Sequence, residues 1–263
     1  MSLAFAAITP HPPLLLPTIG ANQADKLTAT RNALARLEEE LYLAKPNLLI
    51  IISPHGNLLE DAFTVNAAPE LETDLRDFGD LTTRLTFKGT ADLPHRIRGA
   101  AKAEGIPTVL ISERRLDYGA GVPLYFLTPH LSGITIIPLG FSRLDYKTHF
   151  TFGTLLKETI MKSNKRVALI ASADLSHALS SEAPAGFAAA GSTFDATVQE
   201  CLATGNTTAL LQLDPAAVQP AAECGLRSIL ILLGALRHVN YTYEAYAYEA
   251  PFGVGYLTAN FSL

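Results

Sequence analysis

Residues 47–56, NLLIIISPHG, join an uncharged apolar run to a proline, a histidine and a glycine. A short run of this kind, rich in isoleucine and leucine, predicts a strand that is buried on both faces. Similar short runs alternate along the chain with longer segments of helical periodicity. This alternation predicts an α/β fold, specifically a three-layer α/β/α sandwich with a mostly parallel central sheet.

The same patterns predict the individual elements. The predicted strands of the central sheet cover residues 3–8, 47–53, 107–111, 134–139 and 166–172. The predicted helices cover residues 22–44, 91–104, 146–163, 186–204 and about 223–237. Residues 62–67 and 81–87 alternate with a period near two, which is typical of an antiparallel extension. Residues 241–250 and 253–261 predict antiparallel C-terminal strands joined by a turn near 251–253.

Length and composition indicate one domain over residues 1–263. The chain is 48% hydrophobic and 17% charged, which suffices for a full core. A net charge of -5, with Lys and Arg scattered among Asp and Glu, provides no basic stripe, so nucleic acid is not an expected partner. The two cysteines, Cys201 and Cys224, form no disulfide framework and suit a reducing compartment.

The N-terminal residues 8–17, ITPHPPLLLP, are apolar and precede Asp25, the first acidic residue. Four prolines interrupt them and no basic region precedes them, so the pattern favours neither a secretory signal nor a membrane helix. The longest apolar runs elsewhere are far shorter than the roughly 20 residues that span a bilayer. We expect a cytoplasmic protein with no membrane partner.

Histidines follow three of the predicted strands. His11 comes after the first strand, His55 after the second, and His177 ends SADLSH after the strand at 166–172. In open α/β sheets, functional groups gather beyond the carboxyl ends of the strands. Neutral imidazole is the commonest protein ligand of transition metals, and two imidazoles with one carboxylate leave coordination positions open for substrates. The pattern therefore indicates a metal site at this edge.

Two neighbouring residues compete as the third ligand. Glu223, in AAECGLRS (221–228), opens the predicted last helix and offers a carboxylate. It could instead complement the positive end of that helix. Cys224 offers a thiolate, which would favour zinc or copper over iron.

The remaining histidines have ordinary structural interpretations. We expect His95 and His149 on surface helices, His130 near a loop, and His238 at the end of the last helix. Other catalytic signatures are absent from the sequence: there is no G-x-S-x-G motif, and GAGVPL at 119–124 lacks the third glycine of a dinucleotide fingerprint.

Five stretches together resemble a known family. These are TPHPPLLLP, IIISPHG, SADLSH, ECGLRSILILLGAL and YEAPFGVGY, which lie in order between residue 8 and about residue 256. They resemble the class III extradiol ring-cleavage dioxygenase superfamily, B-subunit type, and most closely its Memo-like branch, named for the AmmeMemoRadiSam system. The resemblance implies a three-layer α/β unit and a mononuclear ferrous iron site.

Carried onto this chain, the resemblance implies that His11, His55 and Glu223 bind Fe(II). It implies that His177 is the acid/base residue, with a catechol and dioxygen as substrates and ring opening beside the diol as the reaction. Asp174 would either orient His177 or cap its loop. The family also makes a homodimer a reasonable expectation.

Two departures from the family pattern leave alternatives open. Many members have a histidine in a D-H-G motif, where this chain has Tyr118 between Asp117 and Gly119. Tyr118 can donate a hydrogen bond but is a poor base at neutral pH. In Memo proteins the cysteine matching Cys224 lies at the metal site, so a zinc or copper centre without ring cleavage, serving a radical-SAM-linked system or a partner, is the main alternative. A zinc hydrolase is a third reading.

Overall fold

The computed structural model describes residues 3–21 and 23–263, so residue 22, the first of the predicted helix 22–44, lies outside the described residues. The strands are β1 (Leu3–Thr9), β2 (Leu48–Ser53), β3 (Phe63–Asn66), β4 (Glu70–Thr73), β5 (Thr86–Lys88), β6 (Thr108–Ile111), β7 (Arg115–Leu116), β8 (Thr135–Gly140), β9 (Val167–Ser172), β10 (Thr242–Glu249) and β11 (Tyr256–Ser262). The helices are α1 (Pro17–Gly20), α2 (Thr28–Ala44), α3 (Asp92–Ala103), α4 (Tyr118–Leu127), α5 (Tyr146–Met161), α6 (Ala189–Thr204), α7 (Thr207–Leu211), α8 (Pro215–Val218) and α9 (Leu226–Ala235).

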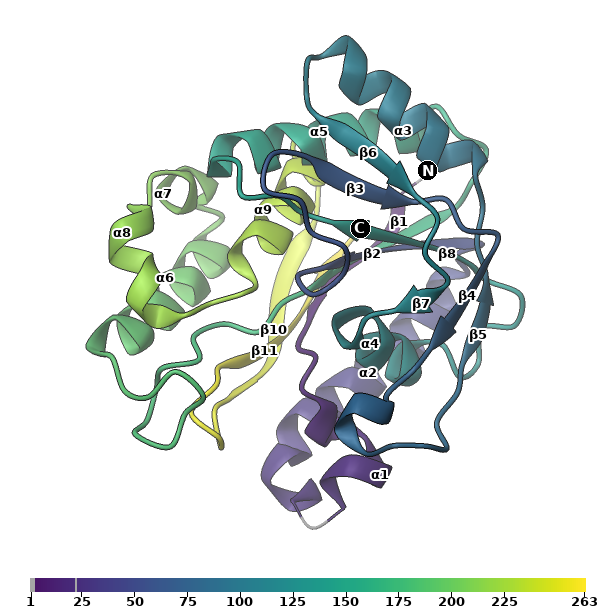
Figure 1. Cartoon of the computed structure of the whole chain (residues 1–263). Coiled ribbons are helices and arrows are strands. Elements are labelled where there is room, and N and C mark those ends of the chain that lie inside the picture. The colour runs from purple at the N-terminus through teal and green to yellow at the C-terminus, as the bar shows by residue number, and fades with distance from the viewer. Residues whose placement is uncertain (1–2, 22) are drawn as a thin grey trace.

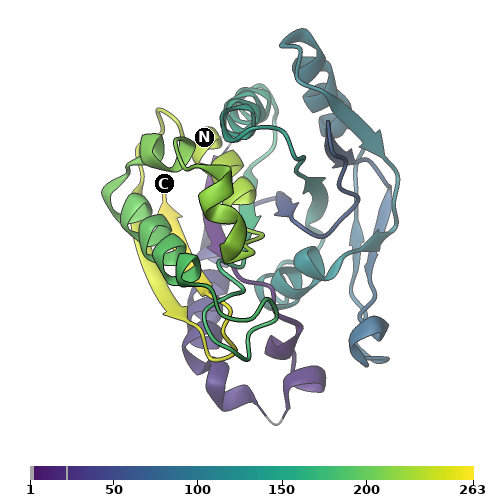
Figure 2. The same ribbon diagram turned by 60° about the vertical axis from the view of Figure 1, so that its left-hand side comes forward.

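One sheet organises the molecule, with strand order β10-β11-β1-β9-β2-β8-β5-β4-β7 (Figure 1). Its centre, β1-β9-β2-β8, is parallel throughout. The C-terminal strands β10 and β11 form an antiparallel hairpin whose second strand also pairs antiparallel with β1. In Figure 2 this hairpin and the pair β4–β5 lie at opposite ends of the molecule.

Helices cover both faces of the sheet, because successive side chains of its central strands point to opposite sides. Ile50 and Ile52 face a core formed with α3, α5, α6 and α9. Ile51, between them, faces a second core formed with α2 and α4. These two cores confirm the predicted α/β sandwich.

Some predicted elements differ from the structure. The strand predicted at 107–111 is β6, which joins the sheet only through β3, and β3 branches from β8. Of the segment 81–87, only its last two residues belong to a strand, β5. His149 does not lie on a surface helix as predicted, because α5 packs it into the core with no exposed area.

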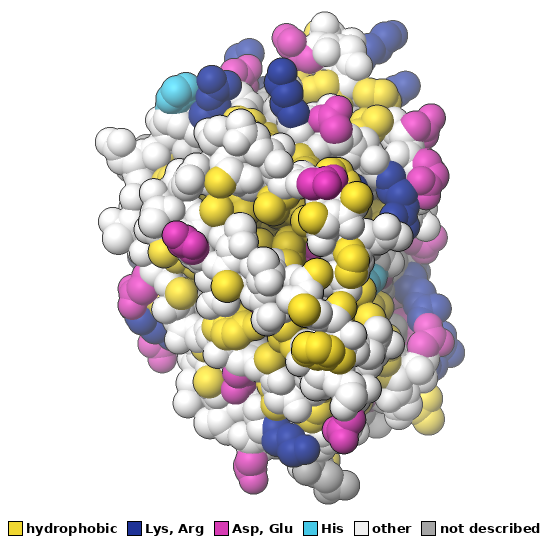
Figure 3. All heavy atoms as spheres, turned by 90° about the vertical axis from the view of Figure 1, so that its left-hand side faces the viewer, with side chains coloured by type: hydrophobic (Ala, Val, Ile, Leu, Met, Phe, Trp, Pro, Cys, Tyr) yellow, Lys and Arg dark blue, Asp and Glu magenta, His cyan; other side chains and the backbone are white. Residues whose placement is uncertain are grey.

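Among the described residues, no helix is long and apolar enough to cross a membrane. On the face drawn in Figure 3, apolar side chains gather over the middle and Lys and Arg side chains are scattered toward the edges.

Candidate metal centre

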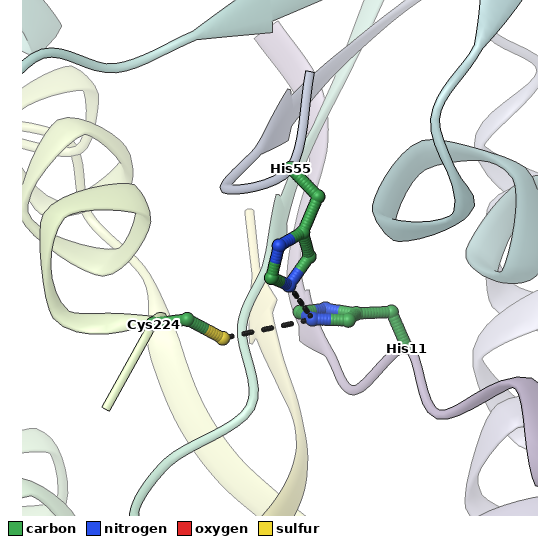
Figure 4. A group of neighbouring side chains, drawn as sticks. All are labelled: His11, His55 and Cys224. Carbon is green, nitrogen blue, oxygen red and sulfur yellow. Dashed lines mark hydrogen bonds between the residues drawn. The ribbon is translucent and has the colours of Figure 1, made fainter. Parts of the chain in front are cut away.

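Three donor atoms converge where β1, β2 and the start of α9 meet. The Nε2 atoms of His11 and His55 face each other at 3.0 Å, and Cys224 Sγ lies 3.6 Å from His11 Nε2 (Figure 4). One ligand atom from each residue lies within 4.8 Å of the other two. His11 follows β1 and His55 follows β2, so the structure brings both predicted histidines to the same edge of the sheet.

The hydrogen bonds of Ser172 fix the tautomer of His11. Ser172 Oγ lies 2.8 Å from His11 Nδ1 and donates its hydrogen to the carbonyl oxygen of Gly119. A hydroxyl has one hydrogen, so Ser172 must accept from Nδ1–H of His11. His11 Nε2 therefore carries the lone pair, which it directs at His55 and Cys224.

Both imidazoles are neutral at physiological pH. Burial, followed by the nearby His55 and His177, holds the pKa of His11 well below its usual value. Burial and then His177 lower the pKa of His55 to about 4. Burial also raises the pKa of the Cys224 thiol, although a coordinated thiol is deprotonated by the metal itself. Two neutral imidazoles and one sulfur are donors that suit a transition metal, so the residues present fit the expected group.

Glu223 lies outside this group of donors. Its Oε2 accepts a hydrogen bond of 2.6 Å from the backbone N–H of Leu226, the first residue of α9. Its Oε1 lies 3.9 Å from Arg227 Nη1. The carboxylate thus folds back on the start of its own helix, while the side chain of Cys224 points to the histidines. The geometry favours Cys224 over the predicted Glu223 as the third donor.

Asp174 supports His11 rather than His177. Its Oδ1 accepts a hydrogen bond of 2.9 Å from the backbone N–H of His11, and its Oδ2 lies 3.5 Å from His11 Nε2. The second contact is not an ion pair, because His11 is neutral. Burial raises the pKa of Asp174 to about 7. Its observed role is to hold the loop after β1.

His177 is arranged as a proton acceptor. Its Nδ1 lies 3.1 Å from the carbonyl oxygen of Leu175, which can only accept, so Nδ1 carries the hydrogen and Nε2 the lone pair. Burial lowers the pKa of His177 and keeps the ring neutral.

Asp195 of α6 fixes the loop that carries His177, and the sequence gave no sign of this role. Its carboxylate accepts from the backbone N–H of Ser176 at 2.8 Å and from the hydroxyl of Tyr248 at 2.7 Å. A Cβ on Gly255 would lie 2.0 Å from Asp195 Oδ2, so only glycine permits this approach of β11's leading loop.

Tyr118 forms a wall of the centre. Its ring stacks on that of His55, with centroids 4.4 Å apart and an interplanar angle of 18°. Burial raises the pKa of its hydroxyl, so it holds its proton at neutral pH. Tyr118 begins α4, which Asp117 caps by accepting from the backbone N–H of Ala120. A Cβ on Gly119 would lie 2.6 Å from Ser53 Oγ, so this turn requires glycine.

A cavity of about 350 Å³ opens beside the centre, and His55 and Tyr118 form part of its wall. Phe78 and Leu116 add apolar surface, and Arg115 is the cation in its lining. A larger groove, of about 1040 Å³, lies against β4 and β5 away from the histidines. The smaller cavity is the one that gives a substrate access to the donors.

Three similarities to known proteins bear on this centre. Residues 5–259 match the family described as "Catalytic LigB subunit of aromatic ring-opening dioxygenase". Protein CA_C1420 of Clostridium acetobutylicum is 30% identical over 265 residues, which cover 97% of this chain and 57% of that protein. The chain thus spans little more than half the length of this relative.

The third similarity is to a solved structure. The uncharacterized protein JW3007 of Escherichia coli K12 superposes with a TM-score of 0.69 over 98% of this chain and 99% of that one, at 17% identity. At this identity the likeness shows the fold alone.

Proposed function

Since the chain belongs to the family of catalytic LigB subunits of aromatic ring-opening dioxygenases, we propose that it is a metal-dependent dioxygenase that opens the ring of a catechol with O2. The observation that carries the proposal is the convergence of His11 Nε2 and His55 Nε2 at 3.0 Å, at the sheet edge where such sites form. We propose His11, His55 and Cys224 as the residues that hold the metal, and Fe(II) as the metal.

Ferrous iron, when bound, would supply the redox and Lewis-acid chemistry that lets a diol react with O2. The protein residues would supply positioning and proton transfer. His177 is neutral with its Nε2 lone pair available, so it would accept a proton from a substrate hydroxyl. Tyr118, stacked on His55, would form a flat wall against an aromatic ring in the 350 Å³ cavity and donate a hydrogen bond.

The test is turnover of protein that has been loaded with Fe(II) under anaerobic conditions. On addition of oxygen and a panel of catechols, we expect ring-fission absorbance and consumption of one O2 per ring opened. His11→Ala should abolish both signals. Protein with verified iron content that consumes no oxygen with any catechol would contradict the proposal.

The sulfur donor favours one second candidate. Cys224 Sγ, at 3.6 Å from His11 Nε2, is a soft ligand of a kind that selects copper or zinc. The second candidate is therefore a copper or zinc centre without ring opening. Metal analysis of the freshly purified protein separates the two, because copper or zinc that is retained by wild type and Glu223→Gln but lost by Cys224→Ser would favour the second.

A further inference from the structure

A second cavity, of about 410 Å³, lies beside the segment that carries Cys224 and is distinct from the cavity at His55. Its polar lining comes from Arg143, Tyr146, Gln219, Glu223 and Arg227. Its apolar lining comes from Pro215, Ala216, Val218 and Ala222. The metal centre uses none of these side chains.

Arg227 is the unusual residue in this lining. Its side chain is only 21% exposed, and its Nε is buried without any hydrogen-bond partner in the part of the chain that the structure describes. Its contact with Glu223 is loose, at 3.9 Å, and its guanidinium lies 5.2 Å from the ring centre of Tyr146. A buried donor with no acceptor is costly, so such a group usually has a partner that a protein-only structure does not contain.

The charges of the cavity favour an anion. Two guanidinium groups, of Arg143 and Arg227, face one carboxylate, of Glu223. That carboxylate already accepts from the backbone N–H of Leu226. Arg143 pairs with Glu60 at 3.0 Å, but this is an exposed pair that contributes little and is easily exchanged for another anion.

We propose that this cavity is a binding site for a small organic carboxylate, which Arg227 holds. The planar guanidinium fork matches a carboxylate in two parallel hydrogen bonds. The apolar part of the lining suits the carbon skeleton of an organic acid better than it suits a bare inorganic anion. The site is additional to the proposed ring-opening activity and needs no metal.

The test uses the full chain after removal of metal with a chelator, with benzoate, glutarate and inorganic phosphate as separate probes. Binding is measured by calorimetry and by the shift in melting temperature. We expect at least one carboxylate to bind and to raise the melting temperature. Arg227→Gln should weaken this binding about 10-fold or more, because it removes a charge-assisted pair.

Two variants keep the test interpretable. Arg84→Gln removes an exposed arginine from the groove beside β5 and should leave binding unchanged. Arg227→Lys keeps the charge but loses the fork, so it should bind more weakly than wild type even if Arg227→Gln does not fold. Equal binding by wild type and Arg227→Lys, binding of phosphate alone, or binding of no probe would each overturn the proposal, and none of these outcomes bears on ring opening.

Discussion

Two places in the molecule bury histidine, and they treat the imidazole nitrogens in opposite ways. His149, in α5, has no exposed area, and its Nδ1 donates to the carbonyl oxygen of Asp145 at 2.8 Å while its Nε2 lies 3.0 Å from the backbone oxygen and 3.4 Å from the backbone nitrogen of Ser142. At the metal centre, His11 and His55 direct Nε2 at each other and at a sulfur. Burial alone therefore does not mark a ligand, whereas a buried nitrogen that the backbone leaves unpaired does.

The sharpest way to break this comparison is to remove one ligand. His55→Ala should lose metal by well over the roughly 10–100-fold that loss of an outer hydrogen-bond partner costs. Metal content after dialysis against a chelator series measures the effect. His149→Gln is the matched control, because it also removes a buried imidazole and should retain metal. Equal metal loss in both variants would contradict the distinction.

The second prediction concerns pH and His149. Burial lowers its pKa to about 4, against 6.5 in the unfolded chain, so the folded state favours the neutral ring. Its contribution to stability is full above pH 6.5 and is lost as the pH falls toward 4, in total about 3 kcal/mol.

Denaturant unfolding of metal-free protein between pH 4 and 8 measures this contribution. His149→Gln should flatten the curve over that range, whereas His95→Gln, at an exposed position on α3, should not. Identical slopes for wild type and His149→Gln would refute the assignment.

A smaller effect should follow from Ser172→Ala. Ser172 fixes the tautomer that leaves His11 Nε2 unprotonated, so its loss should weaken metal binding roughly 10–100-fold. Metal titration with a competing chelator is the measurement. Ser228→Ala is the control, because that hydroxyl is buried but has no hydrogen-bond partner among the described residues. Unchanged affinity in Ser172→Ala would exclude the tautomer argument.

The smallest effect should come from Glu223→Gln. The carboxylate caps α9, and loss of a cap costs about 1 kcal/mol of unfolding free energy. Metal affinity should stay within a factor of about two of wild type if Cys224 is the third donor. Loss of metal from Glu223→Gln with no loss from Cys224→Ser would restore Glu223 as the ligand.

The central sheet could be predicted from sequence because its strands are continuous apolar runs between turn residues. Residues 48–52, LLIII, are an example. The strands β4 and β7 were missed because they are short and partly exposed. Helix α4 was missed because YGAGVPLYFL contains two glycines and a proline, which are poor helix formers in isolation. Its burial between the sheet and α2 supplies what propensity lacks.

The centre was predictable as far as strand ends could be located. His11 and His55 follow predicted strands, and parallel strands present their carboxyl ends at one edge. The choice between Glu223 and Cys224 depends on where α9 begins, and helix boundaries are uncertain by a residue or two. The contact of Ser172 with His11 requires knowing that β9 lies beside β1, which no local pattern reveals.

That placement of β9 also sets the order in which the protein can be built. Ser172, at the end of β9, is 161 residues from His11 in sequence, yet β9 lies between β1 and β2 in the sheet. A growing chain therefore cannot pair β1 and β2 correctly until most of it has been synthesised, and contacts so distant in sequence form slowly. Metal uptake during refolding would consequently time the last step of central-sheet assembly.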